Sequence, residues 1–161
     1  MKFRESPLQT EDYEQELGLS LPPIYKSFIT QFEGVFGDII QNQRGELETL
    51  TYYQYLNREG EDLMFEDFLP IVEMFNNHKN SDSWVENGVI PISSHSHGGT
   101  ILLGIHSSNM DKLFYEHDRG LEFIENDIFS FLRNLTFIME QTVEKDKVIK
   151  KWDKEYWQVN D

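Results

Sequence analysis

Cysteine is absent from the 161 residues of this chain. Disulfide bonds, thiol nucleophiles and thiolate metal sites are therefore excluded. The chain also has no stretch of about 18 apolar residues, the length that a membrane-spanning helix needs. Its first residues, MKFRESPLQTEDYEQE, contain no apolar segment of the kind found in secretory signals. We therefore expect a soluble, cytoplasmic protein with no membrane partner.

Basic residues are scarce, with 14 Lys and Arg against 29 Asp and Glu, a formal net charge of −15. The acidic excess runs through the whole chain and is not confined to one tail. A field of this sign repels nucleic acid and anionic membranes and speeds encounter with basic proteins. The charge thus argues against nucleic-acid binding, and it suits either a basic protein partner or solubility alone.

Aromatic side chains are plentiful, with 12 Phe, 7 Tyr and 3 Trp. This content supplies a core and argues against disorder despite the high charge. The length suits a single domain, 1–161, which buries enough surface to fold without a metal ion.

Two helices are predicted near the start of the chain, from about Glu11 to Leu17 and from about Pro22 to Glu33. Thr10 is a candidate N-cap for the first, and Gly18 is a residue type that ends helices in the left-handed conformation. The proline pair at Pro22 suits a first helical turn, where the missing N–H costs little. One apolar face follows at helical spacing: Tyr25, Phe28, Ile29 and Phe32.

The middle of the chain is β-prone. Short strands are expected at Gly37–Ile40, Leu47–Tyr52, Val89–Ile92, Thr100–Ile105 and Lys112–His117. Pro91 suggests that its strand lies at a sheet edge or ends there. Residues 57–68 and 76–83 are predicted to be loops, with a short helix over Leu69–Phe75, and sheet is expected from Trp84 onward.

A third strong helix pattern covers Ile128–Met139, with Asn126 or Asp127 as its cap. The tail from Thr142 to Asp161 mixes lysines with aromatics and is expected to form a helix over the sheet. Because helices flank a run of strands and do not alternate with them, the class is α+β. We expect an antiparallel sheet of about five or six strands, with N-terminal and C-terminal helices packed on it.

Two blocks of the sequence resemble one family. The pattern LG-x-x-LP-x-x-Y-x-x-F, closing on Gly34, is followed by a Trp, then VIPI, HSHGGT, ILLGI, LFYEHDRG and DIFSFLRNL. This order resembles the SUKH superfamily of Smi/Knr-like domains, which includes fungal cell-wall regulators and many bacterial immunity proteins. The resemblance implies a SUKH-like fold and a non-catalytic binding role. His97 departs from the polar or acidic residue that commonly precedes the Gly turn in relatives.

Several side chains could carry chemistry instead. His95 and His97 alternate on one potential strand face and could bind a metal ion, with His106 or His117 as a third ligand. Carboxylate pairs such as Glu116 and Asp118 could serve a hydrolase. No G-x-S-x-G elbow accompanies the serines near these histidines, and no phosphate-binding loop is present. Solvated turn histidines and a solvated acidic face explain the same residues.

Tyr52, Tyr53 and Tyr55 form either an exposed row suited to protein binding or part of the core. An acidic segment follows them, and aromatic residues rimmed by acids suit a basic protein. The predicted partner-binding residues are Tyr52, Tyr53, Tyr55, Glu59, Glu61, Asp62, Glu66, Asp67, His97 and Asp118.

The resemblance and the charge together predict an immunity protein without a cofactor, which neutralises a cognate, basic, nuclease-type bacterial toxin domain. It would act as a monomer or weak homodimer. The alternatives are an intracellular regulatory scaffold of the Smi/Knr type and, as a lesser one, a hydrolase or metal enzyme built on His95 and His97.

Overall fold

The computed structural model describes residues 2–33, 39–41, 47–49, 53–57, 60, 62–65, 67–94, 99–137 and 148–150. The helices are α1 (Glu11–Leu17), α2 (Pro23–Gln31), α3 (Ile71–Lys79), α4 (Asp82–Asn87) and α5 (Ile128–Asn134). The strands are β1 (Lys2–Phe3), β2 (Phe32–Glu33), β3 (Ile39–Gln41), β4 (Leu47–Thr49), β5 (Tyr53–Leu56), β6 (Asp62–Phe65), β7 (Asp67–Phe68), β8 (Val89–Ser94), β9 (Thr100–Gly104), β10 (Leu113–His117), β11 (Gly120–Glu125), β12 (Leu135–Phe137) and β13 (Val148–Lys150). The predicted α+β class is confirmed.

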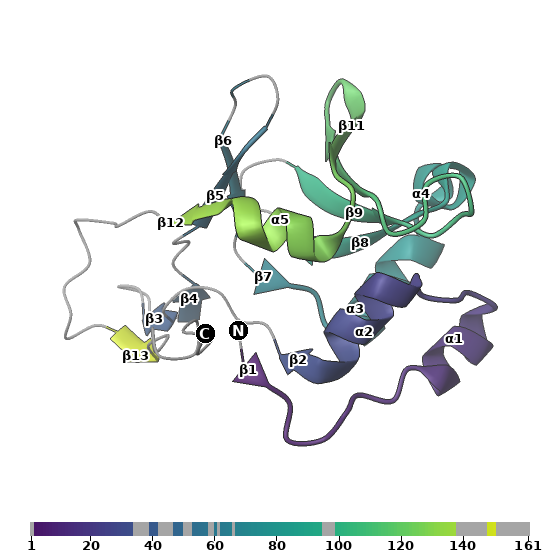
Figure 1. Ribbon diagram of the computed structural model, residues 1–161, viewed down its shortest axis with the longest axis horizontal. Coiled ribbons are helices and arrows are strands. Elements are labelled where there is room, and N and C mark those ends of the chain that lie inside the picture. Colours follow the sequence, from purple (N-terminus) through teal and green to yellow (C-terminus); the bar gives the residue numbers. More distant parts are fainter. Residues whose placement is uncertain are drawn as a thin grey trace.

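The largest sheet has the strand order β11-β10-β9-β8-β7, and every neighbouring pair in it is antiparallel. Its five strands agree with the number expected from the sequence. Smaller antiparallel sheets join β12-β5-β6, β13-β3-β4 and β1-β2. In Figure 1, α2 and α3 lie on the side of the molecule away from the tips of the β5–β6 and β10–β11 hairpins.

The opening helices form largely as the sequence predicts. Gly18 ends α1 in the left-handed conformation with φ of 63°, which glycine adopts without steric cost. Helix α2 buries Tyr25, Phe28 and Ile29. It ends two residues earlier than expected, because Phe32 and Glu33 turn into β2 and pair with β1. Gly34 lies outside the described residues.

Helix α2 starts with Pro22 and Pro23, so no local side chain caps it. The cap comes instead from Asp111, in the β9–β10 connection, whose Oδ1 accepts a hydrogen bond from the Tyr25 N–H at 3.0 Å. Asp111 is buried and has a positive φ of 64°. It thereby fixes the end of the sheet to the start of the helix, satisfying a backbone donor that would otherwise be unpaired.

Two predicted loops are wrong. Residues 57–68 contain β6 and β7, and residues 76–83 complete α3 and begin α4. The second error arises from burial, because His78 is only 5% exposed and its Nδ1 lies 2.7 Å from the Val89 carbonyl. The sheet expected from Trp84 begins only at Val89, since Ser81 caps α4 by accepting from the Trp84 N–H. Helix α3 corresponds to the predicted short helix Leu69–Phe75, starting at Ile71 and extending to Lys79, whereas α4 is a mid-chain helix that the sequence did not predict.

The predicted helix Ile128–Met139 is half as long as its apolar pattern suggested. Asp127 caps it as predicted, accepting from the Ser130 N–H at 2.8 Å. The helix ends at Asn134, and Leu135–Phe137 pair with β5 as β12. In the tail, Val148–Lys150 form a strand and not the expected helix, while the rest of 142–161 lies outside the described residues.

The largest sheet is buried on both faces along β8 and β9. Ile90, Ile92, Ile101 and Leu103 belong to the main core, together with residues from α2, α3 and α5. Val89 and Leu102 are equally buried but belong to the opposite face, because side chains alternate along a strand. Burial on both faces explains the nearly continuous apolar runs VIPI and ILLG.

Pro91 was expected to lie at a sheet edge or a strand end, and the edge environment is found only for the part of β8 around Pro91. Strand β8 lies between β7 and β9, which makes it an internal strand. However, β7 pairs only with Ser93 and Ser94. Pro91 is paired to Leu102 of β9 and lies beyond the reach of β7, where its missing N–H breaks no pairing.

Candidate functional site

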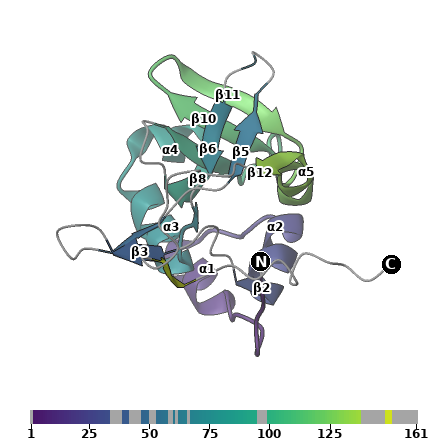
Figure 2. The ribbon, with the colours of Figure 1, turned by 90° about the vertical axis from the view of Figure 1, so that its left-hand side faces the viewer.

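Two hairpins, β5–β6 and β10–β11, lie side by side at one end of the molecule (Figures 1 and 2). Tyr55 joins them, since its hydroxyl donates to the Ile124 carbonyl at 3.0 Å and lies 3.1 Å from Glu125 Oε1. Nearer the tips, Asn57 Nδ2 donates to Glu122 Oε2 at 3.2 Å. These bonds join β5 and the residue after it to β11, the strand that follows the turn containing the predicted Asp118.

Of the two interpretations of the tyrosines, core packing is correct for Tyr55. Its side chain is 5% exposed and stacks on Phe131 with ring centroids 5.2 Å apart. The predicted exposed row is therefore wrong at this position. Tyr53 is half-buried against the core, and burial raises the pKa of its phenol.

The predicted acidic residues divide into those that the structure describes and those that lie outside the described residues. Asp118 is exposed in the β10–β11 turn, and Asp62 and Asp67 start strands β6 and β7. Five predicted binding residues lie outside the described residues, together with the metal candidate His95: Tyr52, Glu59, Glu61, Glu66 and His97. The structure therefore joins the β5–β6 and β10–β11 hairpins, and the partner contacts of all these residues stay predictions.

The histidines that the structure describes lie apart. His106 is exposed in the β9–β10 connection, whereas His117 is at the end of β10, 3.8 Å from Glu122 Oε2. Among the described residues, no cluster of three or more His, Asp or Glu side chains has the arrangement to hold a metal ion. Ser93 is buried in β8, and Ser107 is exposed beside His106.

Sequence reasoning missed an aromatic surface on the second face of the large sheet. It consists of Trp84, Phe114, Leu121 and Phe123, which we call the aromatic face. Phe114 and Phe123 are cross-strand neighbours in an edge-on contact, with ring centroids 6.1 Å apart. Trp84 Nε1 donates to Glu116 Oε2 at 2.8 Å, so α4 is tied to β10. The alternation of residues in LFYEH and GLEFIE indicated that Phe114 and Phe123 lie on one face of the sheet. It did not indicate whether that face is exposed, because this depends on where α4 packs.

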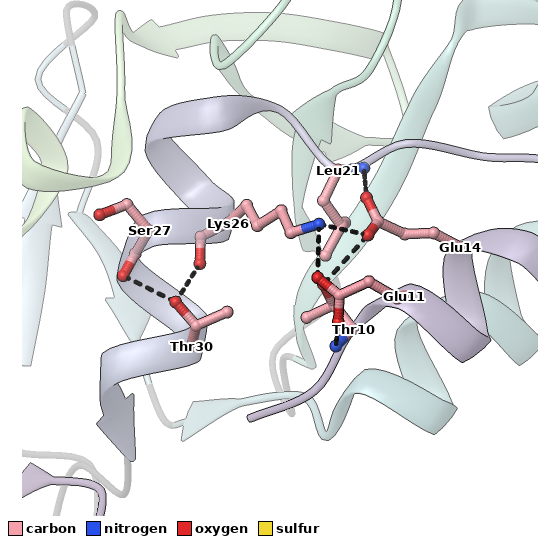
Figure 3. Close-up of polar contacts among 7 residues, drawn as sticks. All are labelled: Thr10, Glu11, Glu14, Leu21, Lys26, Ser27 and Thr30. Carbon is pink, nitrogen blue, oxygen red and sulfur yellow. Dashed lines mark hydrogen bonds and ion pairs between the residues drawn. The ribbon is translucent and has the colours of Figure 1, made fainter. Parts of the chain in front are cut away.

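A second polar cluster, between α1 and α2, has a structural role. Lys26 Nζ lies 2.6 Å from Glu14 Oε2 and 3.3 Å from Glu11 Oε1 (Figure 3). Glu14 also accepts from the Leu21 N–H at 2.7 Å and from the Thr10 hydroxyl at 3.0 Å. Thr10 is thus positioned as the N-cap but bonds Glu14 instead of a helix N–H.

The charges in this cluster stabilise one another. Burial alone would raise the pKa of Glu14, but the hydrogen bonds from Lys26, Leu21 and Thr10 outweigh it and lower that pKa. The same contact with Glu14, helped by Glu11, raises the pKa of Lys26. Since every partner is internal, the cluster holds α1 against α2 and offers no ligand site.

Comparisons with known proteins give a family for the chain. A model of the SMI1 / KNR4 family (SUKH-1) matches residues 6–134. The match spans both sequence blocks, and it includes all the described helices and the complete five-stranded sheet. No curated protein matches the chain. In the part of the chain that the structure describes, no helix has the length and apolar character to cross a membrane.

Proposed function

The chain belongs to the SMI1 / KNR4 family (SUKH-1), and we propose that it is a non-catalytic immunity protein that binds and neutralises a bacterial toxin domain. The observation that carries this proposal beyond the family is the formal net charge of −15. Toxins that cleave nucleic acid need basic surfaces to hold phosphate. A strongly acidic protein is drawn to such a surface and competes there with nucleic acid.

The proposed mechanism is occlusion in the cytoplasm, at the end of the molecule where β5–β6 meets β10–β11. Asp118 is exposed there, and Glu122 is held in place by Asn57. Carboxylates at this end take the positions of nucleic-acid phosphates on the toxin. The other predicted contacts belong to the same proposal, except the buried Tyr55: Tyr52, Tyr53, Glu59, Glu61, Asp62, Glu66, Asp67 and His97. Repulsion between like charges disfavours self-association, which supports a monomer or weak homodimer.

The test is co-expression with a candidate toxin domain, namely the variable C-terminal domain of a large open reading frame next to this gene. The wild-type chain is expected to restore growth and to form a complex with the purified domain. Because the attraction is electrostatic, affinity should fall steeply as salt rises from about 50 to 300 mM. Failure to restore growth, with the chain soluble and folded, rejects the immunity role for that pair.

A matched pair of charge reversals locates the contact. Asp118→Lys removes an exposed acid from the proposed end, whereas Glu16→Lys makes the same charge change on α1. We expect the first to weaken the complex by about tenfold or more and the second to have little effect, since rim charges act mainly at short range. Equal effects would mean that only net charge matters.

The second candidate is a regulatory scaffold of the Smi/Knr type, which the name of the matching family favours. A scaffold has partners in cells that lack any toxin gene. The enzyme alternative is tested by His95→Ala: unchanged growth rescue and unchanged zinc affinity would remove it.

A further inference from the structure

The second face of the large sheet carries a continuous apolar row. Strand register places Phe123 opposite Phe114, Phe114 opposite Leu102, and Leu102 opposite Pro91. Directly opposed residues of antiparallel strands have side chains on the same face, within contact distance of one another. The row therefore crosses four strands, from the β11 edge to β8.

Only part of this row is covered. Leu102 and Pro91 are buried, at the end of the row nearest α4 and the β9–β10 connection. Phe114, Phe123 and Trp84 are partly exposed, and Leu121 is 37% exposed. Within the described part of the chain, these four residues neither belong to the main core cluster nor pack against it. They present aromatic surface to solvent on the β10–β11 half of the sheet.

The surroundings of this surface are acidic. Glu116 lies on the same strand face as Phe114, with Leu121 opposite it and its carboxylate bonded to Trp84. Asp118 is exposed two residues further along. These two acids lie beside the rings, whereas Glu122 is opposite Tyr115 and Glu125 opposite Leu113, on the core-facing side of the same hairpin. Aromatic rings beside carboxylates are suited to guanidinium groups, which stack on rings and donate hydrogen bonds to acids at the same time.

We propose that the aromatic face binds arginine side chains of a basic protein partner. The guanidinium group stacks on Phe114 and Phe123 and pairs with Glu116 or Asp118. A second copy of this chain and a nucleic acid are both disfavoured as occupants, because each would bring negative charge against these acids. The inference relies on the proposed function only for the class of partner, a basic protein.

Two synthetic peptides of equal charge, nonaarginine and nonalysine, test the surface without a toxin. We expect the wild-type chain to bind nonaarginine at least about threefold more tightly than nonalysine at the same ionic strength. In the double variant Phe114→Leu/Phe123→Leu this ratio should fall to near one, with nonalysine binding unchanged. Leucine keeps the apolar packing of the sheet and removes the rings, and circular dichroism and thermal unfolding verify that the variant is folded.

Tyr13→Leu provides the matched control. Tyr13 is also a half-buried aromatic residue among acids, on α1, where it stacks on Phe75. Its substitution should leave the peptide ratio unchanged. The proposal is overturned if neither peptide binds, if the wild type shows no preference for arginine, or if Tyr13→Leu removes the preference as fully as the double variant. None of these outcomes depends on rescue from a toxin, so the two proposals fail separately.

Discussion

Asp111 caps a helix that begins more than eighty residues before it, accepting from the Tyr25 N–H at 3.0 Å. The arrangement exists because the α2 N-terminus is built from prolines, which supply no capping side chain. The same carboxylate lies 3.4 Å from the Ile24 N–H. One residue in the β9–β10 connection thus determines how the helix lies against the sheet.

Replacing Asp111 by Ala should lower the free energy of unfolding by about 1–2 kcal/mol, since a cap is lost and a left-handed backbone remains. Asn keeps an acceptor oxygen and tolerates that conformation, so Asp111→Asn should cost about half as much. Urea unfolding at constant pH measures both. Equal stability of Asp111→Ala and the wild type would show that the cap contributes nothing.

The Glu14 cluster predicts acid sensitivity. The lowered pKa of Glu14 means that its ionised form is favoured in the folded state. Its contribution is complete above the ordinary value of 4.5 and is lost as the pH falls through the lowered value. Glu14→Gln should cost about 1–2 kcal/mol at neutral pH and much less near pH 3. A pH-independent difference between the two chains would contradict this account.

The Tyr55 hydroxyl is predicted to fasten the two hairpins. Tyr55→Phe keeps the ring stacked on Phe131 but leaves the Ile124 carbonyl without this donor. We expect a loss of about 1 kcal/mol and faster amide exchange in β5 and β11, measured by hydrogen exchange. Unchanged exchange in β11 would indicate that the hairpins are held by other contacts.

Gly88 and Gly18 form a matched pair of helix ends, with φ of 60° and 63°. A methyl group at Gly18 meets no atom within 4 Å, whereas one at Gly88 overlaps the His106 ring. Gly18→Ala should cost about 1 kcal/mol from backbone strain alone, and Gly88→Ala roughly 1–3 kcal/mol more. Combining Gly88→Ala with His106→Ala should recover the excess in thermal unfolding, and no recovery would place the clash elsewhere.

Local signals predicted the parts of the fold that local chemistry controls. Gly18 and Asp127 end and start helices as their residue types suggest. The errors occur where contacts between distant parts of the chain determine the local secondary structure. The apolar stripe that begins at Ile128 continues at helical spacing beyond the end of α5. The chain nevertheless leaves the helix at Leu135, which pairs with Tyr55 as part of a strand beside β5. The polar segment around His78 is helical because that side chain is buried against β8.

The candidate site was less predictable for a related reason. Whether a side chain in an alternating strand faces solvent depends on what covers each face of the sheet. Tyr55 was equally consistent with surface and core, and the position of Phe131 decides for the core. In the sequence, Phe114 and Phe123 have the pattern of ordinary strand residues, and the structure was needed to show that α4 packs against β8, three strands away from β11.

The two edges of the large sheet determine how a partner can approach it. At one edge β7 is two residues long and does not reach Pro91 of β8, which has no N–H to donate, while at the other edge the Ile124 carbonyl is occupied by Tyr55. Short or obstructed edges discourage strand addition and the aggregation that accompanies it. A partner that binds this sheet would therefore meet side chains on its faces more readily than unpaired backbone groups at its edges.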